Sequence, residues 1–173
     1  MKEIDYNYFI GNKKQPFHLS IGVVVFNDTK QVLCSHFPKV RDNCDVYSLM
    51  RETIRPNTSL EENLKRGLME EFGVEAINIQ FIGTIISHFI NWEGVEIEKT
   101  TIYFLCKLEK SDQSKITHPD KFEKQLGIIE WQDINFLIQK MKEQSETLQK
   151  TDYDESIILE RASSYINNNE NNI

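Results

Sequence analysis

The sequence predicts an α/β protein, an α/β/α sandwich with a mixed central sheet. Runs rich in β-branched residues recur along the chain and are separated by turn residues, which is typical of strands joined in hairpins. Amphipathic helical segments lie between and after these runs, so helices are expected on both faces of the sheet. Hydrophobic residues make up 39% and charged residues 27% of the 173 residues, which is ordinary for one globular domain.

The first predicted hairpin lies near the N-terminus. His18 to Phe26 is rich in valine and predicts a buried strand, and Asn27 to Lys30 has turn chemistry. Gln31 to Phe37 then returns as a second strand, and Pro38 to Asp45 predicts a polar loop.

The ends of the chain carry less pattern than its middle. Residues 1–17 are expected to form an N-terminal lead-in, and the asparagine-rich residues 167–173 are expected to be disordered. Residues 18–166 are therefore predicted to form a single domain.

The segment from residue 59 to residue 74 has nearly complete helix signals. Ser59, followed by Glu62 three residues later, predicts a capping box, and Gly73 supplies the left-handed residue that commonly ends a helix. The expected apolar stripe consists of Leu60, Leu64 and Leu68.

The polar side of this helix carries the residues with the strongest chemical signal. Glu62, Arg66 and Glu70 are four residues apart and are expected to pair along the solvent side. Asn63, Gly67, Glu70 and Glu71 share a face beside the apolar stripe. Two adjacent carboxylates repel each other unless a cation lies between them, so this face is a candidate metal site.

Residues 66–74, Arg-Gly-Leu-Met-Glu-Glu-Phe-Gly-Val, resemble the second half of a Nudix box. That motif runs Gly, five residues, Glu, seven residues, then Arg-Glu-U-x-Glu-Glu-x-Gly-U, in which U is a bulky aliphatic residue. The matching positions are Arg66, Leu68, Glu70, Glu71, Gly73 and Val74. Three positions depart from the motif, because Glu52 stands at the expected Gly, Thr58 at the expected Glu, and Gly67 at the Glu after the Arg.

The resemblance implies a Nudix-like (MutT-like) α/β/α sandwich with a mixed central sheet over residues 18–165. It also implies a hydrolase in which Mg²⁺ or Mn²⁺ holds the diphosphate of a small molecule, usually one linked to a nucleoside. Carried over by position, Arg66, Glu70 and Glu71 are the catalytic residues, and Glu70 and Glu71 are the metal ligands. A mid-helix glycine costs roughly 1 kcal/mol, so something in the fold tolerates or needs the gap at Gly67.

Other residues are candidates for the same site. Glu96 and Glu98 share a strand face and could add a carboxylate, the alternative being an exposed acidic strand end. Arg51 and Arg55, in a predicted loop over residues 51–58, could bind phosphate or be solvated side chains. His88 could contact a base or sugar, the alternative being an exposed loop residue.

The rest of the chain predicts further strands and two helices. The predicted strands are residues 76–90, 95–108 and 128–131, with a turn at 91–94. A helix follows with an apolar stripe of Ile134, Leu137, Ile138 and Met141, and then a polar stretch covers residues 142–152. The last predicted helix runs from about Tyr153 to Ile166 and is patterned by Ile157, Ile158, Ala162 and Ile166.

Charge and cysteine content narrow the function classes. Lys plus Arg number 20 and Asp plus Glu number 27, and the net charge of −7 argues against binding nucleic acid or anionic membranes. Cys34, Cys44 and Cys106 lack a Cys-x-x-Cys spacing, which argues against a structural zinc or a disulfide framework. No signal peptide or membrane span is apparent, so a cytoplasmic location is expected.

The sequence is compatible with three hypotheses of function. The first is a metal-dependent hydrolase with Glu70 and Glu71 at its centre. The second is a module that binds a nucleotide or sugar diphosphate without turnover, because one acid and the loop glycines are missing. The third is purely structural, with the paired glutamates as a solvated helix face.

Overall fold

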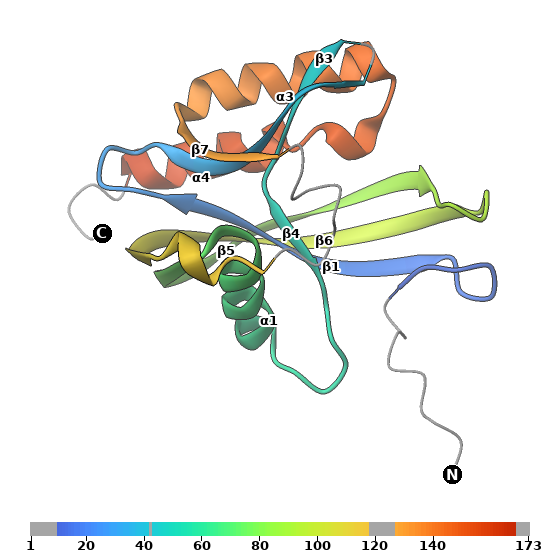
Figure 1. Cartoon of the computed structure of the whole chain (residues 1–173), viewed down its shortest axis with the longest axis horizontal. Helices are drawn as coiled ribbons and strands as arrows, with labels where there is room; N and C mark the ends of the chain where they lie inside the picture. The colour runs from blue at the N-terminus through green and yellow to red at the C-terminus, as the bar shows by residue number, and fades with distance from the viewer. Residues whose placement is uncertain (1–9, 42, 118–126, 169–173) are drawn as a thin grey trace.

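A single mixed sheet of seven strands organises the computed structural model, which describes residues 10–41, 43–117 and 127–168 (Figure 1). The strand order is β3-β2-β1-β6-β5, with β4 also paired to β1 and β7 to β2. The strands are β1 (Phe17–Phe26), β2 (Val32–Arg41), β3 (Cys44–Ser48), β4 (Met50–Thr53), β5 (Val74–Ile90), β6 (Glu96–Ser111) and β7 (Ile128–Gln132). The helices are α1 (Leu60–Gly67), α3 (Ile134–Leu148) and α4 (Ser156–Asn168), with short turns η1 (Leu68–Phe72), η2 (Gln113–Lys115) and η3 (Thr151–Tyr153).

Strand β1 lies at the centre of the sheet and is buried on both faces. It pairs antiparallel with β2 and β4 and parallel with β6, which makes the sheet mixed. Ile21, Val23 and Val25 point to the α1 side, whereas Val24 and Phe26 point to the side covered by α3 and α4. Figure 1 shows α1 on one side of the sheet and α3 and α4 on the other. The predicted sandwich is therefore confirmed.

Each face of the sheet has its own core. On the first face, Leu64 and Leu68 are fully buried, and Phe72 packs beside them. On the second face, the buried residues of the helices are Ile134, Leu137, Met141, Ile158, Leu159, Ala162 and Ile166. Burial of this apolar surface is the main force that holds the helices on the sheet.

Two segments predicted as loops are strands. Strand β2 continues to Arg41, and β3 begins at Cys44, within the predicted loop of residues 38–45. Strand β4 occupies residues 50–53 because its backbone pairs with residues 20–23 of β1. Polar residues in these segments led to the prediction of loops. The backbone hydrogen bonds of a strand do not depend on side-chain polarity, so polar segments can still form strands.

The C-terminal helices also differ from the prediction. Helix α3 extends to Leu148, into the predicted polar stretch. Most polar residues of this extension lie at the surface, whereas Gln144 is buried and accepts a hydrogen bond from the Tyr47 backbone N–H at 2.7 Å. Helix α4 begins at Ser156, since Tyr153 lies in the turn η3. Ile157 is 46% exposed, so it is not part of the buried stripe.

Only part of each terminal segment can be compared with its prediction. The predicted lead-in is described from residue 10 onward, and the first two residues of the predicted tail end α4. Residues 1–9 and 169–173 lie outside the described residues. Within the described part of the chain, none of the helices is long and apolar enough to cross a membrane.

Candidate active site

The N-terminus of α1 has the predicted capping box. The Ser59 hydroxyl accepts a hydrogen bond from the Glu62 backbone N–H at 3.1 Å, and the Glu62 carboxylate accepts one from the Ser59 backbone N–H at 2.7 Å. Glu62 is therefore engaged at the cap, and the predicted pairing of Glu62 with Arg66 is wrong. Leu60 is 40% exposed, so the buried stripe begins one turn later, at Leu64.

The last turn of this helical segment is wider than an α-helix. Leu68 to Phe72 forms a π-helical turn, and Gly73 closes it in the left-handed conformation at φ +63°. A Cβ at Gly73 would lie 2.5 Å from the Asp112 carbonyl oxygen, so glycine is required there. Both catalytic glutamates suggested by the resemblance lie in this turn, and π-turns occur frequently at functional sites.

Arg66 holds Glu70 in place. Its Nη1 atom lies 2.8 Å from a carboxylate oxygen of Glu70 and 3.4 Å from one of Glu52 on β4. Its Nη2 atom donates to the Thr53 carbonyl oxygen at 3.1 Å, and the side chain is only 16% exposed. A second guanidinium, that of Arg55, lies 3.6 Å from the other oxygen of Glu70. The structure thus brings together three of the predicted site residues, which are Arg55, Arg66 and Glu70.

Asn63 fixes the segment that carries Arg55. The Asn63 side chain is 1% exposed and accepts a hydrogen bond from the Arg55 backbone N–H at 2.9 Å. Its amide nitrogen donates to the Thr58 hydroxyl at 2.6 Å and to the Ser59 carbonyl oxygen at 2.8 Å. The polar side chain is satisfied inside the fold, so it ties residues 55–59 to the helix.

The glycine at position 67 is explained by its neighbours on β4. A Cβ there would lie 3.0 Å from the Glu52 Cβ and 3.0 Å from the Met50 sulfur. Such contacts are tighter than ordinary packing, so any larger residue would push against the strand. Glycine at position 67 therefore avoids a tight contact with the side chains of Met50 and Glu52.

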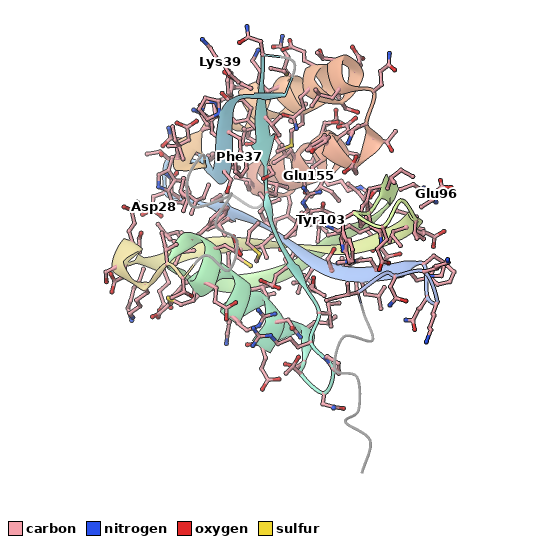
Figure 2. The ribbon with its side chains drawn as sticks, turned by 45° about the vertical axis from the view of Figure 1, so that its right-hand side comes forward. Asp28, Phe37, Lys39, Glu96, Tyr103 and Glu155 are labelled. Carbon is pink, nitrogen blue, oxygen red and sulfur yellow. The ribbon has the colours of Figure 1, made fainter. Side chains whose placement is uncertain are left out.

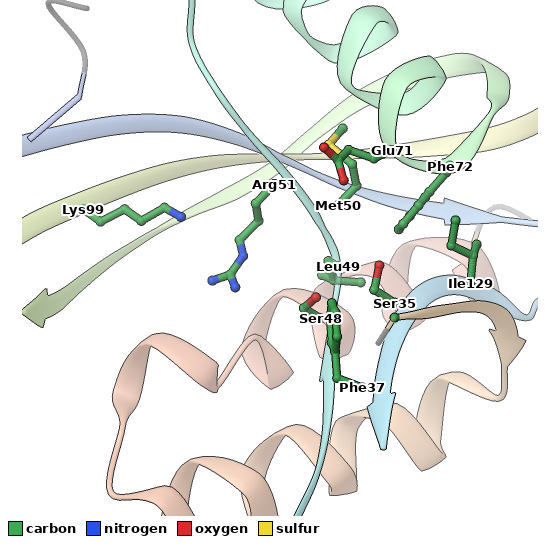
Figure 3. A pocket seen from close by; sticks show the side chains of 11 residues that line it. Ser35, Phe37, Ser48, Leu49, Met50, Arg51, Glu71, Phe72, Lys99 and Ile129 are labelled. Carbon is green, nitrogen blue, oxygen red and sulfur yellow. The ribbon is translucent and has the colours of Figure 1, made fainter. Parts of the chain in front are cut away.

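A pocket of about 170 Å³ opens beside the π-turn. Its lining residues are Ser35, Phe37, Ser48, Leu49, Met50, Arg51, Glu71, Phe72, Lys99, Gly127 and Ile129. Figure 3 shows Lys99 and Arg51 together on one side of this pocket and Glu71 across from them. The pocket therefore has an acidic wall on η1 and a basic wall on β4 and β6.

A buried carboxylate orients Arg51. Glu155 is 2% exposed and accepts hydrogen bonds from the Leu49 backbone N–H at 2.9 Å and from the Tyr103 hydroxyl. Arg51 lies 3.8 Å from Glu155 and donates to the Asp152 carbonyl oxygen at 3.0 Å. Figure 2 shows Tyr103 and Glu155 between the sheet and the C-terminal helices. Arg51 is therefore a fixed part of the pocket and not a solvated loop arginine.

Lys99 lies beside Arg51 in an unusual environment. Burial, together with the nearby Arg51 charge, lowers the pKa of Lys99 to about 7. The charged groups that face it are Arg51, Glu52, Asp152 and Glu155. On the neighbouring strand, burial and the Lys99 charge lower the pKa of His18 to about 4, so His18 is neutral near pH 7. The Lys99 side chain makes no hydrogen bond or ion pair with another described residue.

The remaining candidates lie elsewhere. Glu98 lies 3.7 Å from His88, and both side chains are more than 40% exposed on the β5–β6 hairpin. Glu96 lies at the end of the same hairpin, far from α1 in Figure 2. Glu96 and His88 line a separate hollow with residues 149–152 of the α3–α4 connection. None of these three residues lines the pocket that contains Glu71.

The π-turn carries two adjacent carboxylates, those of Glu70 and Glu71. Within the described residues, no three His, Cys, Asp or Glu side chains gather into a complete protein cage. Mg²⁺ instead commonly binds one or two carboxylates and completes its shell with water and substrate phosphates. Glu70 and Glu71 supply that number of hard oxygen ligands.

Three residues of this region were missed by the sequence prediction. Glu52 was noted only as a departure from the motif, and Glu155 carries no local signal for its role. Lys99 lies in a strand rich in β-branched residues, and this position was the available sequence signal. A charged side chain that points inward from such a strand needs a partner or a ligand.

Comparisons with known proteins agree with this fold. The family model for the NUDIX domain matches residues 16–150, and the chain therefore belongs to the Nudix family. Among solved structures, a NUDIX hydrolase from Nitrosomonas europaea matches with a TM-score of 0.53 and 14% identity, covering 87% of this chain and 88% of that one. At this identity, the match supports the fold alone. No curated protein matches the chain.

Proposed function

We propose that this protein is a divalent-metal-dependent hydrolase that cleaves a diphosphate bond in a small molecule. The proposal is carried by one observation, the placement of Glu71 and Arg51 on opposite walls of one pocket. A metal ion on the acidic wall and a guanidinium on the basic wall suit the two ends of a diphosphate group.

The residues around the pocket have separable roles in this proposal. Glu70 and Glu71 would hold the metal ion, which supplies charge neutralisation of the phosphates and activation of water. Arg66 and Arg55 orient the Glu70 carboxylate, and Glu52 orients Arg66 from the opposite side. Arg51, fixed by Glu155, binds a phosphate oxygen.

A second function is favoured by one specific observation. The acid that the family motif carries at position 67 is missing, and a Cβ there would lie only 3.0 Å from side-chain atoms of β4. A site with one acid fewer could bind a nucleotide or sugar diphosphate and turn it over slowly or not at all. The two functions share the ligand and differ only in chemistry.

A screen of nucleoside and sugar diphosphates with Mg²⁺ or Mn²⁺ tests the proposal. We expect release of phosphate or of a monophosphate product, and we expect Glu71→Gln to abolish it. The matched control is Glu61→Gln, which should leave activity unchanged. Glu61 is an exposed helix residue, and its one ion pair among the described residues is with Lys65. Ligands that raise the melting temperature without turnover would favour the binding module. If no ligand is hydrolysed and none raises the melting temperature, both functions are contradicted.

A further inference from the structure

We infer that Lys99 and Arg51 form a metal-independent subsite for a phosphoryl group of the ligand, on the pocket wall opposite Glu71. The inference rests on the proposed function, because it specifies which part of a phosphorylated ligand lies away from the metal ion. It makes Lys99 a specificity-determining residue.

The first argument is that the Lys99 amine has no partner in the described part of the fold. Its side chain is partly buried, yet it makes no hydrogen bond or ion pair there and lines the pocket instead. A buried ammonium group without a partner is costly, because it has lost its hydration shell. A ligand with a negative charge would supply the missing partner.

The second argument is that Arg51 lies near Lys99 and is held in a fixed position. The guanidinium is fixed by Glu155 and by the Asp152 carbonyl oxygen, and Figure 3 shows its charged end on the same side of the pocket as Lys99. A guanidinium and an ammonium group on the same side of a pocket are a common arrangement for binding phosphate. Ser35 and Ser48 add two hydroxyl groups to the same pocket.

The third argument is the size and polarity of the pocket. Its volume of about 170 Å³ is below the roughly 300–1,000 Å³ usual for drug-sized ligands. Several hydrogen-bond donors in a small space suit a group with several acceptor oxygens, such as a phosphoryl group. A flat carboxylate would use fewer of these donors, and an uncharged base would leave Lys99 unpaired.

Binding of sulfate tests the subsite without using metal or turnover. Sulfate is a tetrahedral oxyanion like phosphate, and EDTA in the buffer keeps Glu70 and Glu71 free of metal. We expect calorimetry to detect sulfate binding to the wild-type protein and Lys99→Met to weaken it about ten-fold or more, as expected for loss of a charge-assisted hydrogen bond. Lys99→Arg should retain most of the affinity. Lys110→Met, on the same strand but 70% exposed, should behave as wild type.

A measurement on the wild-type protein covers the case in which Lys99→Met fails to fold. An amine-modifying reagent at pH 8 should label Lys99, and sulfate should slow this labelling while leaving Lys110 unchanged, as read by peptide mass spectrometry. Equal labelling of Lys99 with and without sulfate would overturn the inference. Acetate that binds as tightly as sulfate would overturn the assignment to a phosphoryl group.

The outcomes for the subsite and for the hydrolase are separable. Metal-dependent hydrolysis without sulfate binding would overturn the subsite and leave the proposed function standing. Sulfate binding that depends on Lys99, without hydrolysis of any diphosphate, would support the subsite and contradict the hydrolase.

Discussion

Restoring a carboxylate at position 67 is the sharpest test of how this site departs from its family. In Gly67→Glu, a good helix former replaces glycine, which gains about 0.5–1 kcal/mol. The new Cβ lies 3.0 Å from the Glu52 Cβ and from the Met50 sulfur, and such overpacking costs about 1–3 kcal/mol. The new charge also lies close to Glu52. We therefore expect a net destabilisation of about 1–2 kcal/mol.

A second substitution should relieve this cost. Glu52→Gly removes both the Cβ that crowds position 67 and the carboxylate that repels the new one. Urea unfolding of the two single variants and the double variant gives their coupling, which we expect to be about 1–2 kcal/mol in favour of the double variant. Calorimetric titration with Mn²⁺ should then show metal binding about ten-fold or more tighter for the double variant than for the wild type.

A control separates crowding from charge repulsion. Glu52→Ala removes the carboxylate and keeps the Cβ, so Glu52→Ala with Gly67→Glu should recover less stability than Glu52→Gly does. If Gly67→Glu alone is as stable as the wild type, and its coupling to Glu52→Gly is below about 0.5 kcal/mol, the packing argument is refuted. Unchanged Mn²⁺ affinity in the double variant would refute the assignment of this helix face to metal binding.

Three further predictions concern single residues. Glu71→Gln should weaken Mn²⁺ binding about ten-fold or more in calorimetry relative to Glu61→Gln, and equal affinities would mean that the metal lies elsewhere. Arg66→Ala should lower the free energy of unfolding by about 2–3 kcal/mol in urea, because it leaves two partly buried carboxylates without their shared cation. A variant that loses turnover but keeps its stability would show instead that Arg66 acts directly in the chemistry. Lys99→Met should be more stable than the wild type below about pH 7, where both the folded and the unfolded wild type carry the Lys99 charge. Between pH 7 and the ordinary lysine pKa of 10.5, the unfolded wild type binds more protons than the folded one, so the stability of the wild type rises with pH. The difference in melting temperature between Lys99→Met and the wild type should therefore shrink over this range. A difference that does not change with pH would contradict the lowered pKa of Lys99.

The sequence by itself determined the local features of the site. The capping box joins residues three apart, and the left-handed Gly73 needs only its own lack of a Cβ. The pairing of Arg66 with Glu70 joins neighbouring turns of one helix. Such features depend on short stretches of chain, so their residue pattern is enough to predict them.

The π-turn is an intermediate case. The pattern predicts a helix that ends at Gly73, and the structure agrees about its end. The widening of the last turn is not visible in the pattern, although Leu68 and Phe72 at its two ends are buried in the core beneath α1.

Only the tertiary structure decided what surrounds the two glutamates. The pairing of β4 with β1 places Glu52 against Gly67, although the sequence predicted a loop there. Glu155 lies 106 residues from Leu49 along the chain and still accepts its backbone hydrogen bond, which fixes Arg51 nearby. Lys99 meets Arg51 because β6 and β4 both pair with β1. These contacts depend on strand pairing and helix docking between distant segments, and no local residue pattern specifies which distant partner a side chain will meet.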